Sequence, residues 1–233
     1  MSEPEIVPSI LSADFTRLGD QLCAALDAGA RRIHVDVMDG RFVPNITMGP
    51  MIVAAIRPLV SKAGGLIEAH LMIVEPERHI TDFANAGADL IIVHVEVSPN
   101  LHRTVEHIHQ LGKQAGVAIN PGTPLSMLDE ILPDIEVALV MTVDPGFGSQ
   151  ELIPRTLEKV ARLRESLKRC RLSQLQIAVD GGIHPDTVAA SVRAGADLLV
   201  AGSGVFNQKA SVADNLSALR QLALANRMAG DGG

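Results

Sequence analysis

The sequence predicts an α/β protein whose eight parallel strands, each followed by a helix, close into a single (β/α)8 TIM barrel. Short runs of β-branched and other apolar residues alternate with longer amphipathic stretches along the whole chain, and no linker or change of composition interrupts them. The length of 233 residues also suits one barrel of this kind. We therefore expect one domain over residues 1–233, with a disordered tail from about residue 226 to 233.

Eight segments have the short, apolar character of buried strands. They are Ile6–Leu11, Arg32–Met38, Leu66–Met72, Leu90–His94, Gly116–Asn120, Val137–Thr142, Leu175–Asp180 and Leu198–Ala201. Amphipathic helices are expected between them, for example at Phe15–Ala28, Pro76–Ala86, Leu101–Leu111, Ile153–Leu167 and Thr187–Ala194. Ala-Gly-Ala recurs before three strands, around Gly29, Gly87 and Gly195, where glycine suits the left-handed residue that ends a helix. An open doubly wound sheet is the alternative fold, but the glycine-rich fingerprint after its first strand is missing.

The composition argues against nucleic acids and membranes as partners. The net charge is −7, and the chain has five Phe but no Trp or Tyr, so it repels phosphate backbones and offers few stacking partners to bases. No apolar run approaches the length that spans a membrane, and the first residues lack the character of a signal peptide. Cys23 and Cys170 have no metal-like spacing and predict no disulfide framework. We expect a cytoplasmic protein.

Polar residues occur within strands that should be apolar on both faces. His34 and Asp36 share one face of the second strand, His70 lies on the third, and Asp180 ends the seventh. A buried lone carboxylate costs several kcal/mol unless it is paired or coordinated. Two His and two Asp at the barrel end that carries active sites therefore predict one divalent metal site, for Zn²⁺, Fe²⁺, Mn²⁺ or Co²⁺. The alternative is four separate core residues, each satisfied by a hydrogen bond or an arginine.

Glycine-rich turns predict a phosphate site. Asp-Gly-Gly closes the seventh strand at 180–182, and Ala-Gly-Ser-Gly closes the eighth at 201–204. Barrels often bind phosphate at these two loops and at the start of a short helix that follows, because glycine lets backbone N–H groups approach the anion. The loop at 144–150, with glycines on both sides of Phe147, is interpreted as a lid, although a plain long turn is the alternative.

A series of motifs resembles the ribulose-phosphate 3-epimerase family. They are Pro8-Ser-Ile-Leu-Ser-Ala-Asp-Phe15, His34-Val-Asp-Val-Met-Asp-Gly40, Phe42-Val-Pro-Asn45, His70-Leu-Met72, Asn120-Pro-Gly-Thr-Pro124, Asp144-Pro-Gly-Phe-Gly148, Val179-Asp-Gly-Gly182 and Ala201-Gly-Ser203. The resemblance implies a barrel of the ribulose-phosphate-binding type. It also implies a metal-dependent isomerase that interconverts D-ribulose 5-phosphate and D-xylulose 5-phosphate, with proton exchange at C3 through a metal-stabilised enediolate.

The resemblance assigns roles to individual residues. It implies that His34, Asp36, His70 and Asp180 hold the metal and that the two Asp are the catalytic pair. Substrate contacts would come from Ser9, His70, Gly146, Phe147, Gly148, Ser149, Asp180, Gly181, Gly182, Gly202 and Ser203. Three methionines, Met38, Met72 and Met141, would lie beneath the reacting atoms, or would simply fill the core. Ser149 departs from the family, which usually has Gly there. The family also implies a homo-oligomer, a dimer or a hexamer.

The sequence is also compatible with other functions. A 3-epimerase of a ketohexose 6-phosphate, such as D-allulose 6-phosphate, would carry nearly the same motifs. A non-catalytic sugar-phosphate-binding protein would keep the glycine loops but would not need four metal ligands. A Schiff-base aldolase or a metal-free decarboxylase is disfavoured, because the lysines all fall outside the expected strands: Lys62, Lys113, Lys159, Lys168 and Lys209.

Several polar residues allow two interpretations. Glu68 either orients a metal ligand or faces solvent at the bottom of the barrel. His94 and Glu96 either support the site or are ordinary residues at a strand end. Three histidines after the fourth strand either form a solvated helix face or a second metal site, with the former favoured: His102, His107 and His109.

Overall fold

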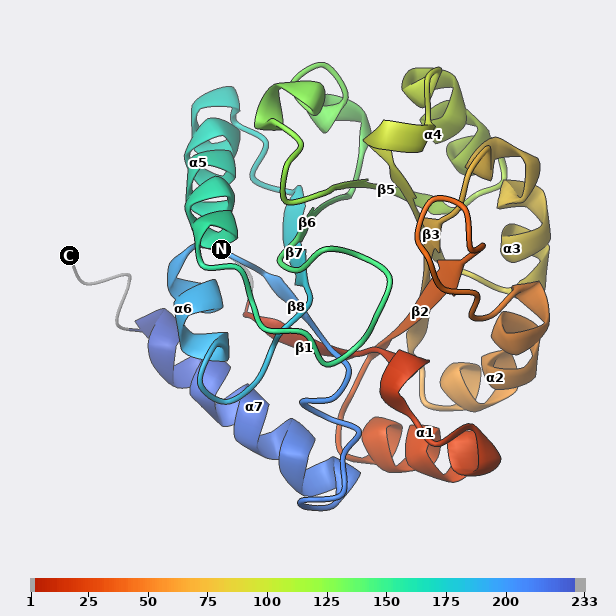
Figure 1. The fold of residues 1–233 in the computed structure, drawn as a ribbon, viewed down its shortest axis with the longest axis vertical. Helices are drawn as coiled ribbons and strands as arrows, with labels where there is room; N and C mark the ends of the chain where they lie inside the picture. The colour runs from red at the N-terminus through yellow and green to blue at the C-terminus, as the bar shows by residue number, and fades with distance from the viewer. Residues whose placement is uncertain (1–2, 229–233) are drawn as a thin grey trace.

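The computed structural model describes residues 3–228 and shows a barrel of eight parallel strands (Figure 1). The strands are β1 (Glu5–Pro8), β2 (Arg32–Met38), β3 (Leu66–Met72), β4 (Leu90–His94), β5 (Gln114–Ile119), β6 (Val137–Met141), β7 (Gln176–Asp180) and β8 (Leu198–Ala201). They pair in the order β1-β8-β7-β6-β5-β4-β3-β2, and a parallel bridge between Ser9 and His34 joins the two ends. The predicted barrel is confirmed and the open sheet is excluded. The predicted ranges of β2, β3, β4 and β8 match the structure.

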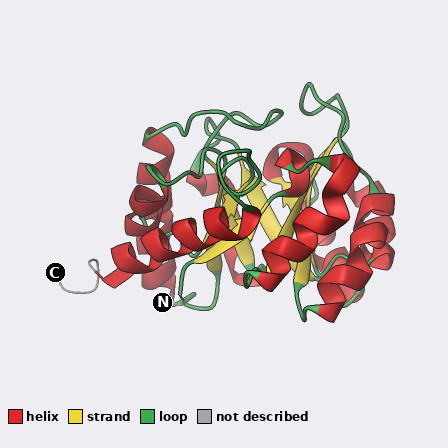
Figure 2. Cartoon of the chain, turned by 90° about the horizontal axis from the view of Figure 1, so that it is seen from below, coloured by secondary structure: helices red, strands yellow, loops and turns green. Residues whose placement is uncertain are grey.

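Seven α-helices surround the strands within residues 3–228, and the longer loops gather at one end of the barrel (Figure 2). They are α1 (Leu18–Asp27), α2 (Pro50–Lys62), α3 (Ile80–Ala86), α4 (Leu101–Gln110), α5 (Arg155–Cys170), α6 (Val188–Arg193) and α7 (Val212–Met228). The disordered tail was expected to begin at about residue 226, but α7 continues to residue 228, so residues 226–228 are helical. Residues 229–233 lie outside the described residues. No helix in the described part of the chain is both long and apolar enough to cross a membrane.

The expected helix after β5 is replaced by two 3₁₀ turns, at Leu125–Met127 and Leu132–Asp134. Prolines at positions 121, 124 and 133 interrupt this connection, and proline supplies no backbone N–H for a continuous helical ladder. The prediction of eight complete strand-then-helix units was therefore wrong for the fifth unit.

The first strand is also shorter than predicted. It ends at Pro8 instead of Leu11, and a 3₁₀ turn follows at Ile10–Ser12. The Ser9 hydroxyl accepts a hydrogen bond from the backbone N–H of Leu11 at 3.3 Å, which caps the turn. The turn carries the chain over the mouth of the barrel, towards the site described below.

Side chains alternate along the strands as predicted. Ile33, Val35 and Val37 of β2 belong to the large apolar cluster between the strands and the helices, which leaves His34 and Asp36 pointing into the barrel. A second apolar cluster, which includes Leu90, Leu139 and Leu198, fills the barrel interior. The glycines of the three Ala-Gly-Ala triplets have φ values of 98°, 106° and 104°, so they occupy the left-handed region as expected: Gly29, Gly87 and Gly195.

Two arginine–aspartate pairs close the amino-terminal end of the barrel, which we call the floor. Before β4, Asp89 accepts hydrogen bonds from the backbone N–H of Ile67 at 2.8 Å and from Arg57 at 2.5 Å. Before β8, Asp197 accepts from the backbone N–H of Ile177 and from Arg164 in the same way. Each pair therefore joins a helix to two neighbouring strands.

We expect Asp197→Ala to lower the free energy of unfolding by about 3–5 kcal/mol. The substitution leaves Arg164, a residue that is only 8% exposed, without its carboxylate partner. Chemical denaturation measures the change. Glu165→Ala on the same helix is the matched control: it breaks the exposed pair with Lys168 and should cost at most about 1 kcal/mol. Equal losses in the two variants would contradict the assigned role of the buried pair.

Candidate active site at the mouth of the barrel

Four side chains converge at the carboxyl ends of β2, β3 and β7. One ligand atom from each of His34, Asp36, His70 and Asp180 lies within 4.8 Å of all the others. Strand register explains the meeting, because Asp36 on β2 lies directly opposite His70 on β3. His34 and His70 are fully buried, and the residues Asp36 and Asp180 are 3% and 8% exposed. The predicted four residues therefore form one cluster.

The cluster has the geometry of a metal site. Nε2 of His34 lies 3.3 Å from Oδ1 of Asp36, and Nδ1 of His70 lies 3.3 Å from the same oxygen. Nδ1 of His70 also lies 3.3 Å from Oδ2 of Asp180. One nitrogen of each ring and one oxygen of each carboxylate thus face a common point. Two imidazoles and two carboxylates are a donor set that fits a divalent transition metal.

Charge is concentrated at this point. Burial of the His34 ring lowers its pKa, but the carboxylates of Asp36 and Glu68 raise it by more, and the pKa lies well above its usual range. Burial likewise raises the pKa of Asp36, but the rings of His34 and His70 hold it well below its usual range. The paired carboxylates are thus stabilised by positive charge, so protons and a metal ion compete for the cluster.

Glu68 supports the cluster from inside the barrel. Its side chain is 1% exposed, and Oε2 accepts a hydrogen bond from Nδ1 of His34 at 3.1 Å. Oε1 pairs with Arg32 at 2.8 Å. Because the carboxylate holds the hydrogen on Nδ1, the second proton leaves from Nε2 when a metal ion displaces it, and the lone pair of Nε2 then faces the cluster. The orienting interpretation of Glu68 is therefore favoured over solvent exposure, and its partner is His34.

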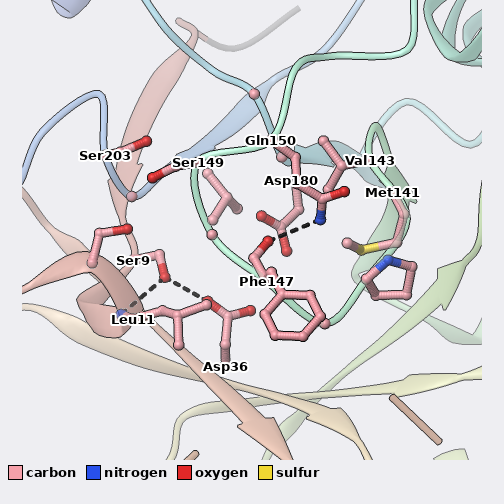
Figure 3. A pocket seen from close by; sticks show the side chains of 18 of the residues that line it. Ser9, Leu11, Asp36, Met141, Val143, Phe147, Ser149, Gln150, Asp180 and Ser203 are labelled. Atoms are coloured by element: carbon pink, nitrogen blue, oxygen red, sulfur yellow. Dashed lines mark hydrogen bonds between the residues drawn. The ribbon is translucent and has the colours of Figure 1, made fainter. Parts of the chain in front are cut away.

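Ser9 positions Asp36. The Ser9 hydroxyl donates a hydrogen bond of 2.5 Å to Oδ2 of Asp36, as Figure 3 shows. Oδ1 of the same carboxylate faces the histidines. The two oxygens of Asp36 are therefore distinct, one directed to the cluster and one to the serine.

A cavity lies over the cluster and is lined by most of the predicted substrate-binding residues. These are Ser9, Gly146, Phe147, Gly148, Ser149, Asp180, Gly181, Gly182, Gly202 and Ser203, together with Asp36. The side chains of both predicted catalytic residues reach this space, and Figure 3 shows them in it. The predicted contact of His70 with substrate differs, because its ring is fully buried and does not line the cavity.

Methionines form part of the cavity wall. Met38, Met72 and Met141 all line it and are 1–5% exposed. Thioether side chains present a soft apolar surface beside the carboxylates. The prediction that they lie beneath the reacting atoms is consistent with this position.

Sequence reasoning missed several cavity residues, of which Ser12 is the most informative. A Cβ atom placed on Gly202 would lie 2.6 Å from the Ser12 hydroxyl oxygen, and one on Gly148 would lie 3.5 Å from it. Ser12 therefore lies between the lid and the loop after β8. Its position follows from the early end of β1, which the apolar run up to Leu11 concealed.

The loop at 144–150 passes over the cavity. A Cβ atom on Gly146 would meet Cδ of Pro44 at 3.0 Å, so the loop packs closely against the segment after β2. The Gln150 side chain donates to the backbone carbonyls of Asp144 and Phe147, which braces the turn. Phe147 is 57% exposed. Ser149 has φ 59°, in the left-handed region that favours glycine.

Other polar groups have ordinary partners or lie beside the cluster. His107 contacts Thr81, and His109 contacts Glu136. The cluster described above is the only metal-like group found within residues 3–228, so a second site among these histidines is not supported. His94 is fully buried against His70, and burial lowers the pKa of His94 to about 4 although Glu96 opposes the shift.

The positions of the lysines bear on the Schiff-base and decarboxylase alternatives. None of the strands in the described part of the chain contains a lysine. Lys159, on α5, is 6% exposed and donates to three backbone carbonyls of the loop after β5. The disfavoured Schiff-base and decarboxylase interpretations gain no support.

A closed parallel barrel with a buried His₂Asp₂ cluster beside glycine-rich loops defines a (β/α)8-barrel enzyme with a candidate metal site. The model of the Ribulose-phosphate 3 epimerase family matches residues 5–206, and the chain belongs to this family.

Curated relatives agree with this assignment, and a solved structure of another enzyme shares the fold. The chain is 54% identical over 204 residues to the ribulose-phosphate 3-epimerase of Synechocystis sp., and the matched region covers 87% of each chain. It is 46% identical to that of Bacillus subtilis, over 88% of this chain and 93% of the relative. The structure of 3-keto-L-gulonate-6-phosphate decarboxylase from Vibrio cholerae shares the fold at a TM-score of 0.69 and 12% identity, over 95% and 98% of the two chains.

Proposed function

We propose that this enzyme interconverts D-ribulose 5-phosphate and D-xylulose 5-phosphate by proton exchange at C3, with one divalent metal ion per chain. The observation that carries the proposal is that two carboxylates, Asp36 and Asp180, reach one cavity from different sides of the barrel. Their strands, β2 and β7, are separated by β1 and β8. Family membership supports the same reaction.

Two carboxylates explain how the configuration at C3 is inverted. One Asp removes the proton from C3, and the electron pair of that C–H bond forms a double bond between C2 and C3 while charge moves to the C2 oxygen. The other Asp, protonated, returns a proton to the opposite face of C3. A single base would tend to restore the starting sugar.

Neighbouring side chains orient Asp36 and the histidine ligands. Ser9 holds Oδ2 of Asp36, and Glu68 holds His34 with Nε2 towards the cluster. His34, Asp36, His70 and Asp180 would hold Zn²⁺, Fe²⁺, Mn²⁺ or Co²⁺. When bound, such an ion supplies Lewis-acid stabilisation, worth several kcal/mol, for the negative charge that develops on the substrate oxygens.

The loops after β7 and β8 are suited to the substrate phosphate. A Cβ atom on Gly181 would lie 2.4 Å from Val143, and one on Gly182 would lie 2.5 Å from the backbone nitrogen of Leu152. No side chain fits at either position, so an anion would meet backbone N–H groups directly. After β8 the chain forms a single helical turn, closed by hydrogen bonds from Val205 and Phe206 to the Gly202 carbonyl. Phosphate held here fixes the distance of C3 from the carboxylates.

Steady-state assays with D-ribulose 5-phosphate and D-allulose 6-phosphate test the substrate. We expect kcat/KM to favour the pentose by at least about tenfold, because one additional carbon must fit between the metal cluster and the phosphate loops. The reverse preference would favour a ketohexose-phosphate 3-epimerase. Absence of turnover of both sugars by metal-loaded protein would favour a non-catalytic binding protein.

Family membership also leads us to propose a homo-oligomer, a dimer or a hexamer, made of single-domain chains in the cytoplasm. Two exposed apolar side chains suit such an interface: Ile46 in the loop after β2 and Met51 in the first turn of α2 are 77% and 76% exposed. Light scattering measures the mass, and a monomer at micromolar concentration would contradict the proposal.

We expect Ser149→Gly to leave KM within about twofold of the wild-type value and Ser149→Val to raise it by about 5–30-fold. Residue 149 is left-handed, which costs a residue with a Cβ atom about 1–2 kcal/mol and a β-branched residue more. Serine tolerates this backbone, whereas valine should shift the loop away from the phosphate. An unchanged KM in the valine variant would show that the conformation of this loop does not affect substrate binding.

A further inference from the structure

We propose that His94 and Glu96 form a hydrogen-bonded relay that fixes the tautomer of His70 and thereby sets the metal affinity of the cluster. The inference rests on the metal site of the proposed function and assigns positioning roles to residues that do not touch the cavity. It concerns β4 and the loop after β5, which contribute nothing to the cavity lining.

The two ring nitrogens of His70 have different neighbours. Nδ1 faces the cluster, 3.3 Å from both Asp36 and Asp180. Nε2, on the opposite side of the ring, lies 2.9 Å from Nε2 of His94. The two ring planes are within 14° of each other, and their centroids are 5.0 Å apart. The rings therefore meet edge to edge through their nitrogen atoms, in the arrangement of a hydrogen bond.

The position of each hydrogen follows from Glu96. Nδ1 of His94 lies 3.0 Å from Oε2 of Glu96. A carboxylate only accepts, so His94 carries its hydrogen on Nδ1 and presents a lone pair at Nε2. That lone pair accepts the Nε2–H of His70. A neutral His70 with its hydrogen on Nε2 has a free lone pair on Nδ1, which is what a metal ligand requires.

Glu96 is itself held in place. Its Oε1 accepts from the backbone N–H of Asn120 at 2.8 Å and from the hydroxyl of Thr123. Lys159 donates to the carbonyls of residues 120, 121 and 123 at distances of 2.6–3.0 Å, which fixes the loop from the other side. The Asn-Pro-Gly-Thr-Pro motif thereby acquires a role as the anchor of the relay.

Both histidines of the cluster are thus backed by a carboxylate, but in different ways. Glu68 accepts from His34 directly, whereas Glu96 acts on His70 through the ring of His94. Removing the acceptor leaves a fully buried N–H of His70 without a partner. Loss of such an outer partner typically lowers metal affinity by about 10–100-fold.

Competition with a chromophoric chelator measures the Zn²⁺ affinity of the full-length protein. We expect His94→Leu to weaken it by about 10–100-fold. His94→Gln should stay within about threefold of wild type, because its amide accepts from His70 and donates to Glu96. His109→Leu, which breaks a comparable contact with Glu136 away from the cluster, should leave the affinity unchanged. A folded His94→Leu variant with wild-type affinity would overturn the relay.

Nitrogen-15 spectra of histidine-labelled, Zn²⁺-loaded wild type give a readout that does not depend on any variant folding. We expect His70 to carry its hydrogen on Nε2 and His94 to carry its hydrogen on Nδ1. A His70 without a hydrogen on Nε2 would overturn the relay while the metal site stands. Failure of wild type to take up any metal would instead overturn the metal cluster, and the relay with it.

Discussion

Asp36→Asn and Asp180→Asn are each expected to slow epimerisation by about 10²–10⁴-fold while the barrel still folds. Asparagine keeps the shape of the side chain, and at position 36 it can still accept from Ser9. An amide, however, neither removes nor returns a proton near neutral pH. Circular dichroism checks the fold. Because both residues are also candidate metal ligands, kcat is measured in both directions with each variant loaded to full metal occupancy.

Isotope exchange separates the two carboxylates. In D₂O, each variant should exchange the C3 hydrogen of only one of the two sugars, without inverting it, because the remaining Asp still serves one face. Asp36→Asn and Asp180→Asn should act on opposite sugars. If both variants exchanged the same sugar, the two carboxylates would lie on one face of C3, and the two-base mechanism would be wrong.

Asp82→Asn, at an exposed position of α3, is the matched control for the same chemical change. It should retain wild-type kcat. Near-normal turnover in either site variant would remove that residue from the catalytic pair.

Removal of the metal should abolish most of the activity and also destabilise the barrel. Loss of several kcal/mol of charge stabilisation corresponds to a fall in kcat of about 10³-fold. The free energy of unfolding should fall by about 3 kcal/mol if the free ion is at about 100 times its Kd, and Tm by about 5–10 °C. Chelation followed by calorimetry and assay measures both quantities, and addition of Zn²⁺, Fe²⁺, Mn²⁺ or Co²⁺ should restore them.

A variant that lacks one ligand provides the control for chelation. His34→Gln should show reduced activity before treatment, and chelation should change its Tm little. Full activity of wild type after complete removal of metal would contradict the Lewis-acid role. A drop in Tm of His34→Gln equal to that of wild type would show that the chelator acts elsewhere.

The parts of this site that follow from one strand at a time were predictable. Alternation with period two placed His34 and Asp36 on the inner face of the second strand, and the glycine-rich turns marked the loops after β7 and β8. Both patterns are local, so they can be recognised in the sequence without knowing how neighbouring strands are aligned.

Contacts between strands were not predictable, because they depend on register. His34 lies opposite Glu68 across β2 and β3, and this pairing decides which histidine the carboxylate orients. The approach of His94 to His70 likewise depends on how β4 is aligned with β3. The apolar run that ends at Leu11 gave no sign that Pro8 and Ser9 turn the chain across the mouth.

The floor pairs around Asp89 and Asp197 have a practical consequence for engineering. They lie at the amino-terminal ends of the strands, whereas every residue that lines the cavity comes from the carboxyl-terminal ends or the loops beyond them. Thermostability can therefore be raised by redesigning the underside of the molecule, while selectivity is evolved independently in the upper loops.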